Sequence, residues 1–199
     1  LPAGATARER TSPRRRLIIP VVLAAVLAVA LAVPALADTV TLTDISGLQA
    51  AIDGASGPRT IEIAAGTHVL GGNINVSKPD ITIQGQGTLA TQIQVSGTGY
   101  RFSVTGSGCT IQNLDLYKTD TTGPQDIIWI GANDLTIQDN LFHGQYAFGD
   151  PDVSRAMVGS AGYSGILITN NEIHSLRQPG YFSAISRRPR WGPSPRRAA

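Results

Sequence analysis

The chain has 199 residues, of which 42% are hydrophobic and 15% are charged, and its formal net charge at pH 7 is +2. The basic excess lies at the two ends, because residues 38–186 hold thirteen Asp or Glu against six Lys or Arg, which leaves a balance of −7. An acidic body of this kind argues against the phosphate backbone of a nucleic acid as a partner. It would also repel uronate polysaccharides unless a cation bridged them.

The first 37 residues have the pattern of a secretory signal peptide. Five arginines within the first 16 residues precede an apolar run from Leu17 to Ala37, which ends in Ala35-Leu36-Ala37. The charged, apolar and small-residue order predicts cleavage after Ala37 and a secreted protein that begins at Asp38, with no stable membrane insertion after cleavage. The run is also long enough to span a bilayer, so a retained membrane anchor is the alternative. Pro34 and the Ala-x-Ala site favour cleavage.

Residues 44–54 are predicted to form a short helix. The segment Ser46-Gly47-Leu48-Gln49 fits a capping box, and Ile45, Leu48 and Ile52 fall on one side of such a helix. A stacked repeat protein exposes an apolar end and an open strand edge at its first unit. We therefore expect this helix to cover the N-terminal end of the fold.

A strand-like phrase then recurs along the chain. Its apolar and polar residues alternate with the two-residue period of a strand. The third residue of each phrase is an isoleucine, and these anchors follow one another after 28, 26 and 31 residues. Steps of this size predict one supersecondary unit per repeat, stacked on the previous one to bury a shared core. The four phrases are Ile81-Thr82-Ile83-Gln84, Cys109-Thr110-Ile111-Gln112, Leu135-Thr136-Ile137-Gln138 and Ile166-Leu167-Ile168-Thr169.

The positions around each anchor predict which residues face inward. Apolar residues stand two positions before the anchor and again five positions after it. Cys109 belongs to this inward set, so we expect it to act as a small core residue and not as a nucleophile, which needs exposure and an electropositive neighbour. The inward set comprises Ile81, Cys109, Leu135 and Ile166 before the anchors and Leu116, Phe142 and Ile173 after them.

Asparagine and aspartate follow the anchors at equivalent positions. Asn140 and Asn171 stand three residues after their anchors, and Asn113, Asp139 and Asn170 stand two residues after theirs. Asn and Asp tolerate left-handed backbone, and their side chains bond neighbouring main-chain groups. The pattern therefore predicts a sharp corner between two strands and an asparagine ladder through the stack.

Together these motifs resemble the right-handed parallel β-helix proteins of the pectin-lyase-like superfamily, which includes the pectate lyases. The resemblance rests on residues 59–68 and 80–87 and on the endings Asn140–His143 and Asn171–His174, and it covers residues 39–186. It implies an all-β fold, a right-handed parallel β-helix over residues 38–186. It also implies a secreted carbohydrate-active protein, but the superfamily includes lyases, hydrolases, epimerases and inert adhesins, so fold does not fix activity.

The first candidate site is a file of outward side chains, one from each of three successive repeats. Tyr117, His143 and His174 stand six residues after their anchors, so their side chains are expected about 4.8 Å apart from coil to coil. Asp115 and Glu172 are predicted to flank this file. Such side chains could bind a sugar chain along a groove, and a histidine could act as a general base. The alternative is that the file is an ordinary side-chain ladder of stacked coils.

A polysaccharide lyase would need further groups around this file. β-Elimination requires a cation or an arginine to neutralise the uronate carboxylate, and Lys118 and Arg177 lie just past the file. Trp129 is a candidate sugar-binding platform, since Ile128 and Ile130 beside it are expected to face inward. Asp115, Asp120, Asp126 and Glu172 are candidate Ca²⁺ ligands, although no compact ligand spacing is visible.

The tail of the chain departs from the repeat. Residues 187–199 hold five arginines and three prolines without alternation. They predict either a disordered basic tail or a frame-shifted end of a chain that is truncated at its C-terminus, and we favour the second. Two functions stay open: a polysaccharide lyase acting by β-elimination, or a non-catalytic cell-surface protein that binds a polysaccharide or cell-wall glycan.

Overall fold

The computed structural model of the chain describes residues 37–96, 99, 101–119, 124–146, 153–182 and 190–191. Contacts divide the chain into two units at Ala35, and all that follows concerns the second unit. Residues 1–36 of the predicted signal peptide, Asp120 and all of the tail except residues 190–191 lie outside the described residues. Within the described residues no helix is long and apolar enough to cross a membrane.

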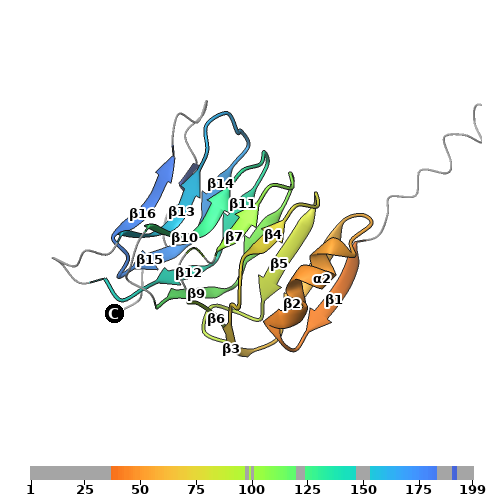
Figure 1. The fold of residues 1–199 in the computed structure, drawn as a ribbon. Helices are drawn as coiled ribbons and strands as arrows, with labels where there is room; N and C mark the ends of the chain where they lie inside the picture. The colour runs from red at the N-terminus through yellow and green to blue at the C-terminus, as the bar shows by residue number, and fades with distance from the viewer. Residues whose placement is uncertain are drawn as a thin grey trace, which may run out of the picture. The chain divides into compact units, whose positions relative to one another are not determined.

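The strands form three parallel sheets, which we name in the order in which the chain meets them (Figure 1). The first sheet has seven strands, in the order β1 (Asp38–Leu42), β2 (Arg59–Ile63), β5 (Ile81–Gly85), β8 (Thr110–Gln112), β11 (Thr136–Gln138), β14 (Leu167–Thr169) and β17 (Arg190–Trp191). The second has five: β3 (Gly66–Val69), β6 (Thr91–Val95), β9 (Asp115–Lys118), β12 (Leu141–His143) and β15 (Glu172–His174). The third also has five: β4 (Ile74–Val76), β7 (Phe102–Val104), β10 (Pro124–Ile130), β13 (Val153–Gly159) and β16 (Gln178–Phe182).

The chain visits the three sheets in turn and then returns to the first, so each set of three strands is one coil of a β-solenoid. Every strand pairs in parallel with the equivalent strand of the next coil. The predicted register is confirmed, because Ile83 pairs with Ile111, Ile111 with Ile137, and Ile137 with Ile168. The predicted all-β, parallel β-helical class is therefore the observed fold.

The core runs through the inside of the coils. The anchors are all buried, and so are the predicted inward residues Ile81, Cys109, Leu135 and Ile166. Leu116 and Phe142 are fully buried as well, whereas Ile173 is half-buried and packs against the core. The two-residue period of each strand thus separates an apolar interior from a polar exterior.

Two-residue corners join the first sheet to the second in three successive coils. Asn113, Asp139 and Asn170 have φ values of 58°, 55° and 54°, the left-handed conformation that Asn and Asp tolerate. The asparagine ladder is also present. Asn140 accepts from the backbone N–H of Leu114 and donates to the carbonyl of Ile111, and Asn171 repeats the second bond with Ile137 one coil later.

The N-terminal helix consists of the 3₁₀ turn η1 (Ile45–Gly47) and α2 (Leu48–Asp53). Leu48 and Ile52 are fully buried, and α2 contacts β2 and β4. The predicted capping box at Ser46 is wrong. The cap is Asp44, whose carboxylate accepts from the backbone N–H of Ser46 at 2.7 Å, and this hydrogen bond lowers the pKa of Asp44.

The register predicts that adjacent residues of one strand respond differently to the same substitution. Ile137→Asp places a charge in the stacked core, so it should lower the free energy of unfolding by several kcal/mol and prevent soluble accumulation. Thr136→Asp changes the neighbouring outward position, where surface substitutions cost about 0.5 kcal/mol or less. The soluble yield of each variant, and thermal melting of the soluble protein that is recovered, measure the difference. Equal melting temperatures would contradict the register.

The corner predicts a second pair of outcomes. Asn140→Ala removes the acceptor of the buried Leu114 N–H, and a buried group left without its partner costs about 1–3 kcal/mol. Asn113→Gly is the matched control, because glycine adopts the same left-handed backbone without strain. Urea denaturation should therefore show a loss for Asn140→Ala and little or none for Asn113→Gly. If both variants lost the same amount of stability, the loss in Asn140→Ala could not be assigned to the ladder bonds.

Candidate functional site

The outer face of the second sheet carries two rows of side chains that run from coil to coil. Their inward neighbours Ile93, Leu116 and Phe142 are fully buried, so the alternate residues point outward. One row holds Gln92, Asp115, Leu141 and Glu172, and the other holds Gln94, Tyr117, His143 and His174. We call Tyr117, His143 and His174 the ring file.

The rings of the file are stacked. The centroids of Tyr117 and His143 are 4.4 Å apart with planes at 19°, and those of His143 and His174 are 5.3 Å apart with planes at 21°. Because stacked rings cover one another's faces, the file presents polar ring edges. The hydroxyl oxygen of Tyr117 also accepts from Gln145 Nε2 at 2.6 Å. The ring file is thus suited to hydrogen bonding with hydroxyl groups more than to stacking a sugar on an aromatic face.

A buried carboxylate lies beside the middle ring. Oδ1 of Asp115 is 2.8 Å from His143 Nε2, in a close electrostatic contact that lacks the alignment of a full hydrogen bond. Oδ2 of Asp115 accepts from Gln92 Nε2 at 2.9 Å, which fixes the carboxylate. A carboxylate beside an imidazole is an arrangement that can orient a general base. Sequence reasoning placed Asp115 on the flank of the file, and the structure brings it into contact with His143.

A groove of about 620 Å³ adjoins the row of Asp115 and Leu141. It forms because the corner between β5 and β6 spans residues 86–90, whereas only residues 113–114 separate β8 from β9. The longer corner raises Leu89, which is 96% exposed, above the tight corners of the following coils. The lining includes the polar residues Asn113, Asp139, Asn170 and Glu172.

Lys118 does not face the ring file, as it was expected to. Lys118 pairs with the core residue Val95 on the inward side of β9 and is only 1% exposed. The two-residue period explains this placement, since Lys118 follows the outward Tyr117 directly. Arg177 is exposed and follows β15 by three residues, and Glu172 is half-buried at the groove.

Trp129 lies on the outer face of the third sheet, as expected from its neighbours. Ile128 and Ile130 are fully buried, and Trp129 is half-buried. Its ring lies so close over Gly131 that a Cβ added there would collide with it. The guanidinium carbon of Arg101 is 5.5 Å from the centroid of the Trp129 ring, a cation–π distance.

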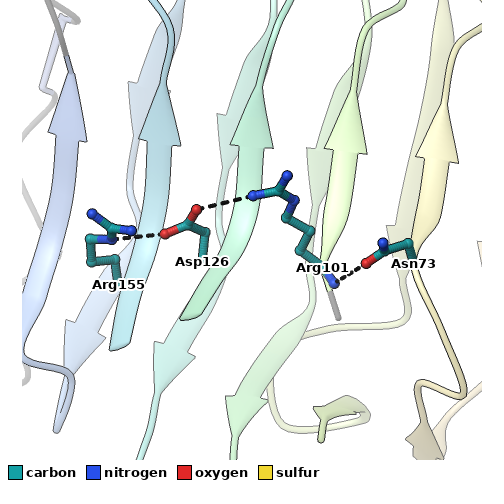
Figure 2. Close-up of polar contacts among 4 residues, drawn as sticks. All are labelled: Asn73, Arg101, Asp126 and Arg155. Atoms are coloured by element: carbon teal, nitrogen blue, oxygen red, sulfur yellow. Dashed lines mark hydrogen bonds and ion pairs between the residues drawn. The ribbon is translucent and has the colours of Figure 1, made fainter. Parts of the chain in front are cut away.

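Close to Trp129, the third sheet holds a cluster that sequence reasoning missed (Figure 2). Asp126 Oδ1 accepts from Arg155 Nε at 2.8 Å, and its Oδ2 accepts from Arg101 Nη1 at 3.3 Å. We call these three residues the arginine fork. A signal was present, because 25 residues separate Arg101 from Asp126 and 29 separate Asp126 from Arg155, close to the step of the repeat. Aligning the chain on that step would have placed the three charges in adjacent coils.

The described acidic residues do not assemble a calcium site. Among them no three His, Cys, Asp or Glu side chains come together as metal ligands. Asp115 contacts His143 on the second sheet, and Asp126 is held by two arginines on the third. Calcium needs several oxygen ligands at one point, so the arrangement of Asp115, Asp126 and Glu172 does not fit this ion.

Comparison with known proteins finds no relative: no family model, no curated protein and no solved structure matches this chain. A function for this chain is therefore inferred from the geometry of the two outer faces.

Cys109 yields a prediction about reactivity. Burial raises the pKa of its thiol, so the reactive thiolate is scarcer at pH 8 than for an exposed cysteine. A disulfide reagent such as dithionitrobenzoate should react with the native protein far more slowly than with the urea-unfolded protein. Fast reaction with the native protein would contradict the buried position of Cys109.

Proposed function

We propose that this protein is a secreted, carbohydrate-active β-helix protein related to the pectin-lyase-like superfamily, and that it binds an extended polysaccharide on the outer face of the second sheet. The observation that carries the proposal is the ring file, in which Tyr117, His143 and His174 lie in register over three successive coils beside a groove. The signal-like residues 1–37 support secretion.

A linear polymer suits this face for a geometric reason. Equivalent side chains recur about every 4.8 Å along the stack, so successive sugar units would meet similar groups. The polar ring edges, together with the amide side chains of Gln92, Gln94 and Gln145, can donate to and accept from sugar hydroxyls. Leu141 adds an apolar patch between two polar positions of its row. The carboxylates of Asp139 and Glu172 line the groove, so uncharged sugar units suit it best.

A second candidate function is β-elimination on a polysaccharide. It is favoured by the 2.8 Å contact between Asp115 and His143, which could orient the imidazole to remove a proton beside a uronate carboxylate. That reaction also needs a positive group to neutralise the carboxylate. Of the two predicted basic residues, Arg177 is exposed, whereas Lys118 faces the interior. The described geometry therefore supports binding more fully than catalysis.

If the ring file binds a glycan, truncating its side chains should weaken the affinity for that glycan. His143→Ala and His174→Ala should each weaken the affinity for a neutral oligosaccharide by about threefold to tenfold, the value of one ordinary hydrogen bond. Calorimetric titration against a panel of neutral and acidic oligosaccharides measures the effect. Thr110→Ala, an outward residue of the first sheet, is the control and should leave the affinity unchanged. A panel with no ligand, or equal affinities in all variants, would remove the proposal.

Catalysis makes a separate prediction. If the protein is a lyase, wild type should release unsaturated sugars, detected by their ultraviolet absorbance, and Asp115→Asn should reduce that rate because it weakens the orientation of His143. An inactive wild type that still binds glycans would leave the non-catalytic function as the correct one.

A further inference from the structure

Each of the three sheets ends in an edge strand at the N-terminal end of the solenoid. Among the described residues these edge strands are β1, β3 and β4. An edge strand exposes backbone N–H and C=O groups with which another chain can pair. The edge of β4 is closed, because Oε1 of Gln49 accepts from the N–H of Asn75 at 2.8 Å and Nε2 of Gln49 donates to the Asn75 carbonyl at 3.2 Å. The edge of β3 is irregular, because this strand starts at Gly66, whose φ of 131° is outside the range of a regular strand.

The outer edge of β1 has the regular geometry that a further strand needs. The N–H of Asp38 and the carbonyl of Leu42 are hydrogen-bonded, at 3.1 and 2.8 Å, to the residues that flank β2. Backbone groups alternate in direction along a strand, so Val40 also points its groups toward β2, whereas Thr39 and Thr41 point theirs away from it. Among the described residues no strand lies on that side of β1.

Neither charge nor bulk blocks this edge. Natural edge strands are often protected by charged side chains or by proline. The one charged residue of β1 is Asp38, and its Oδ2 lies 2.7 Å from Nη2 of Arg59 in an ion pair. The helical segment η1 and α2 covers the same end of the solenoid, and its exposed residues have short side chains: Ser46, Ala50 and Asp53.

We propose that β1 pairs in antiparallel order with β1 of a second copy of this chain, which gives a two-fold symmetric dimer. The sequence Thr39-Val40-Thr41 reads the same in both directions. A two-fold axis at Val40 therefore places Thr39 opposite Thr41 of the second copy, and Thr41 opposite its Thr39. Opposite residues of this kind exchange both of their backbone hydrogen bonds in an antiparallel pair, and they are the residues of β1 whose groups point away from β2.

The proposed interface is separate from the sugar-binding face. It lies at the edge of the first sheet, whereas the ring file lies on the outer face of the second sheet. Dimerisation can therefore fail while glycan binding holds, and glycan binding can fail while dimerisation holds.

Sedimentation velocity of the full chain, in the form in which it is secreted, tests for the dimer. β1 is five residues long, so the contact is smaller than a standard stable interface. We expect a dissociation constant of roughly 10 µM to 1 mM and a concentration-dependent shift from monomer to dimer. A chain that stays monomeric over this range would overturn the proposal. So would growth into larger oligomers, because a two-fold contact closes at the dimer.

Two double variants test the register of the pairing. Thr39→Lys/Thr41→Lys puts like charges directly opposite each other, so it should raise the dissociation constant by about tenfold or more. Thr39→Lys/Thr41→Glu changes the same two exposed positions but puts each lysine opposite a glutamate, so it should stay within about threefold of wild type. Equal effects in the two variants would rule out the proposed register.

The other open edge supplies a control. Thr67→Lys/Val69→Lys changes outward residues of β3 and should leave the dimer as it is in wild type. Loss of the dimer in this variant, with none in Thr39→Lys/Thr41→Lys, would assign the contact to β3 and remove β1.

Amide hydrogen exchange measured by NMR examines the same backbone groups directly. The N–H groups of Thr39 and Thr41 should exchange fast in dilute protein and slowly at concentrations where the dimer forms. The N–H of Val40 points toward β2, so it should be protected at every concentration and serves as the internal control. Fast exchange of both threonines in a sample that sedimentation shows to be dimeric would place the interface elsewhere.

Discussion

The tight corner between the first and second sheets is the constraint on which the rest of the structure depends. Asn113, Asp139 and Asn170 turn the chain in two residues through left-handed backbone, and the side chains of Asn140 and Asn171 accept from the backbone N–H groups of Leu114 and Asn140 in the turns. Because the corner has the same length in three coils, the strands after it start in register. Both the stacked core and the rows of the outer face follow from that register.

Much of this could be predicted from the sequence because each repeat carries the same local pattern of residues. The isoleucine anchors fix the register, and the alternation beside them fixes which residues face inward. The ring file follows from the same count, since Tyr117, His143 and His174 stand at one distance from their anchors. The left-handed corners were predictable as well, because asparagine and aspartate tolerate left-handed backbone better than other non-glycine residues do.

The rest could not be predicted because it depends on contacts across coils or on departures from the repeat. The arginine fork joins three coils, and its residues belong to none of the recurring phrases. The groove exists because one corner is longer than the others, a difference that the anchors do not reveal. The prediction for Lys118 failed for a different reason. It was chosen as a site residue for its charge, but the two-residue period of the strand places it on the inward side.

The most direct test of the proposed binding face is an NMR titration of the isotope-labelled protein with a neutral oligosaccharide that binds it. We expect the imidazole Cε1–H signals of His143 and His174 to shift together as the ligand is added, because both rings belong to one file. The methyl signals of Thr110 and Thr136, on the outer face of the first sheet, should stay where they are. Shifts confined to those threonines, with both histidine signals unmoved, would contradict the assignment of function to the second sheet.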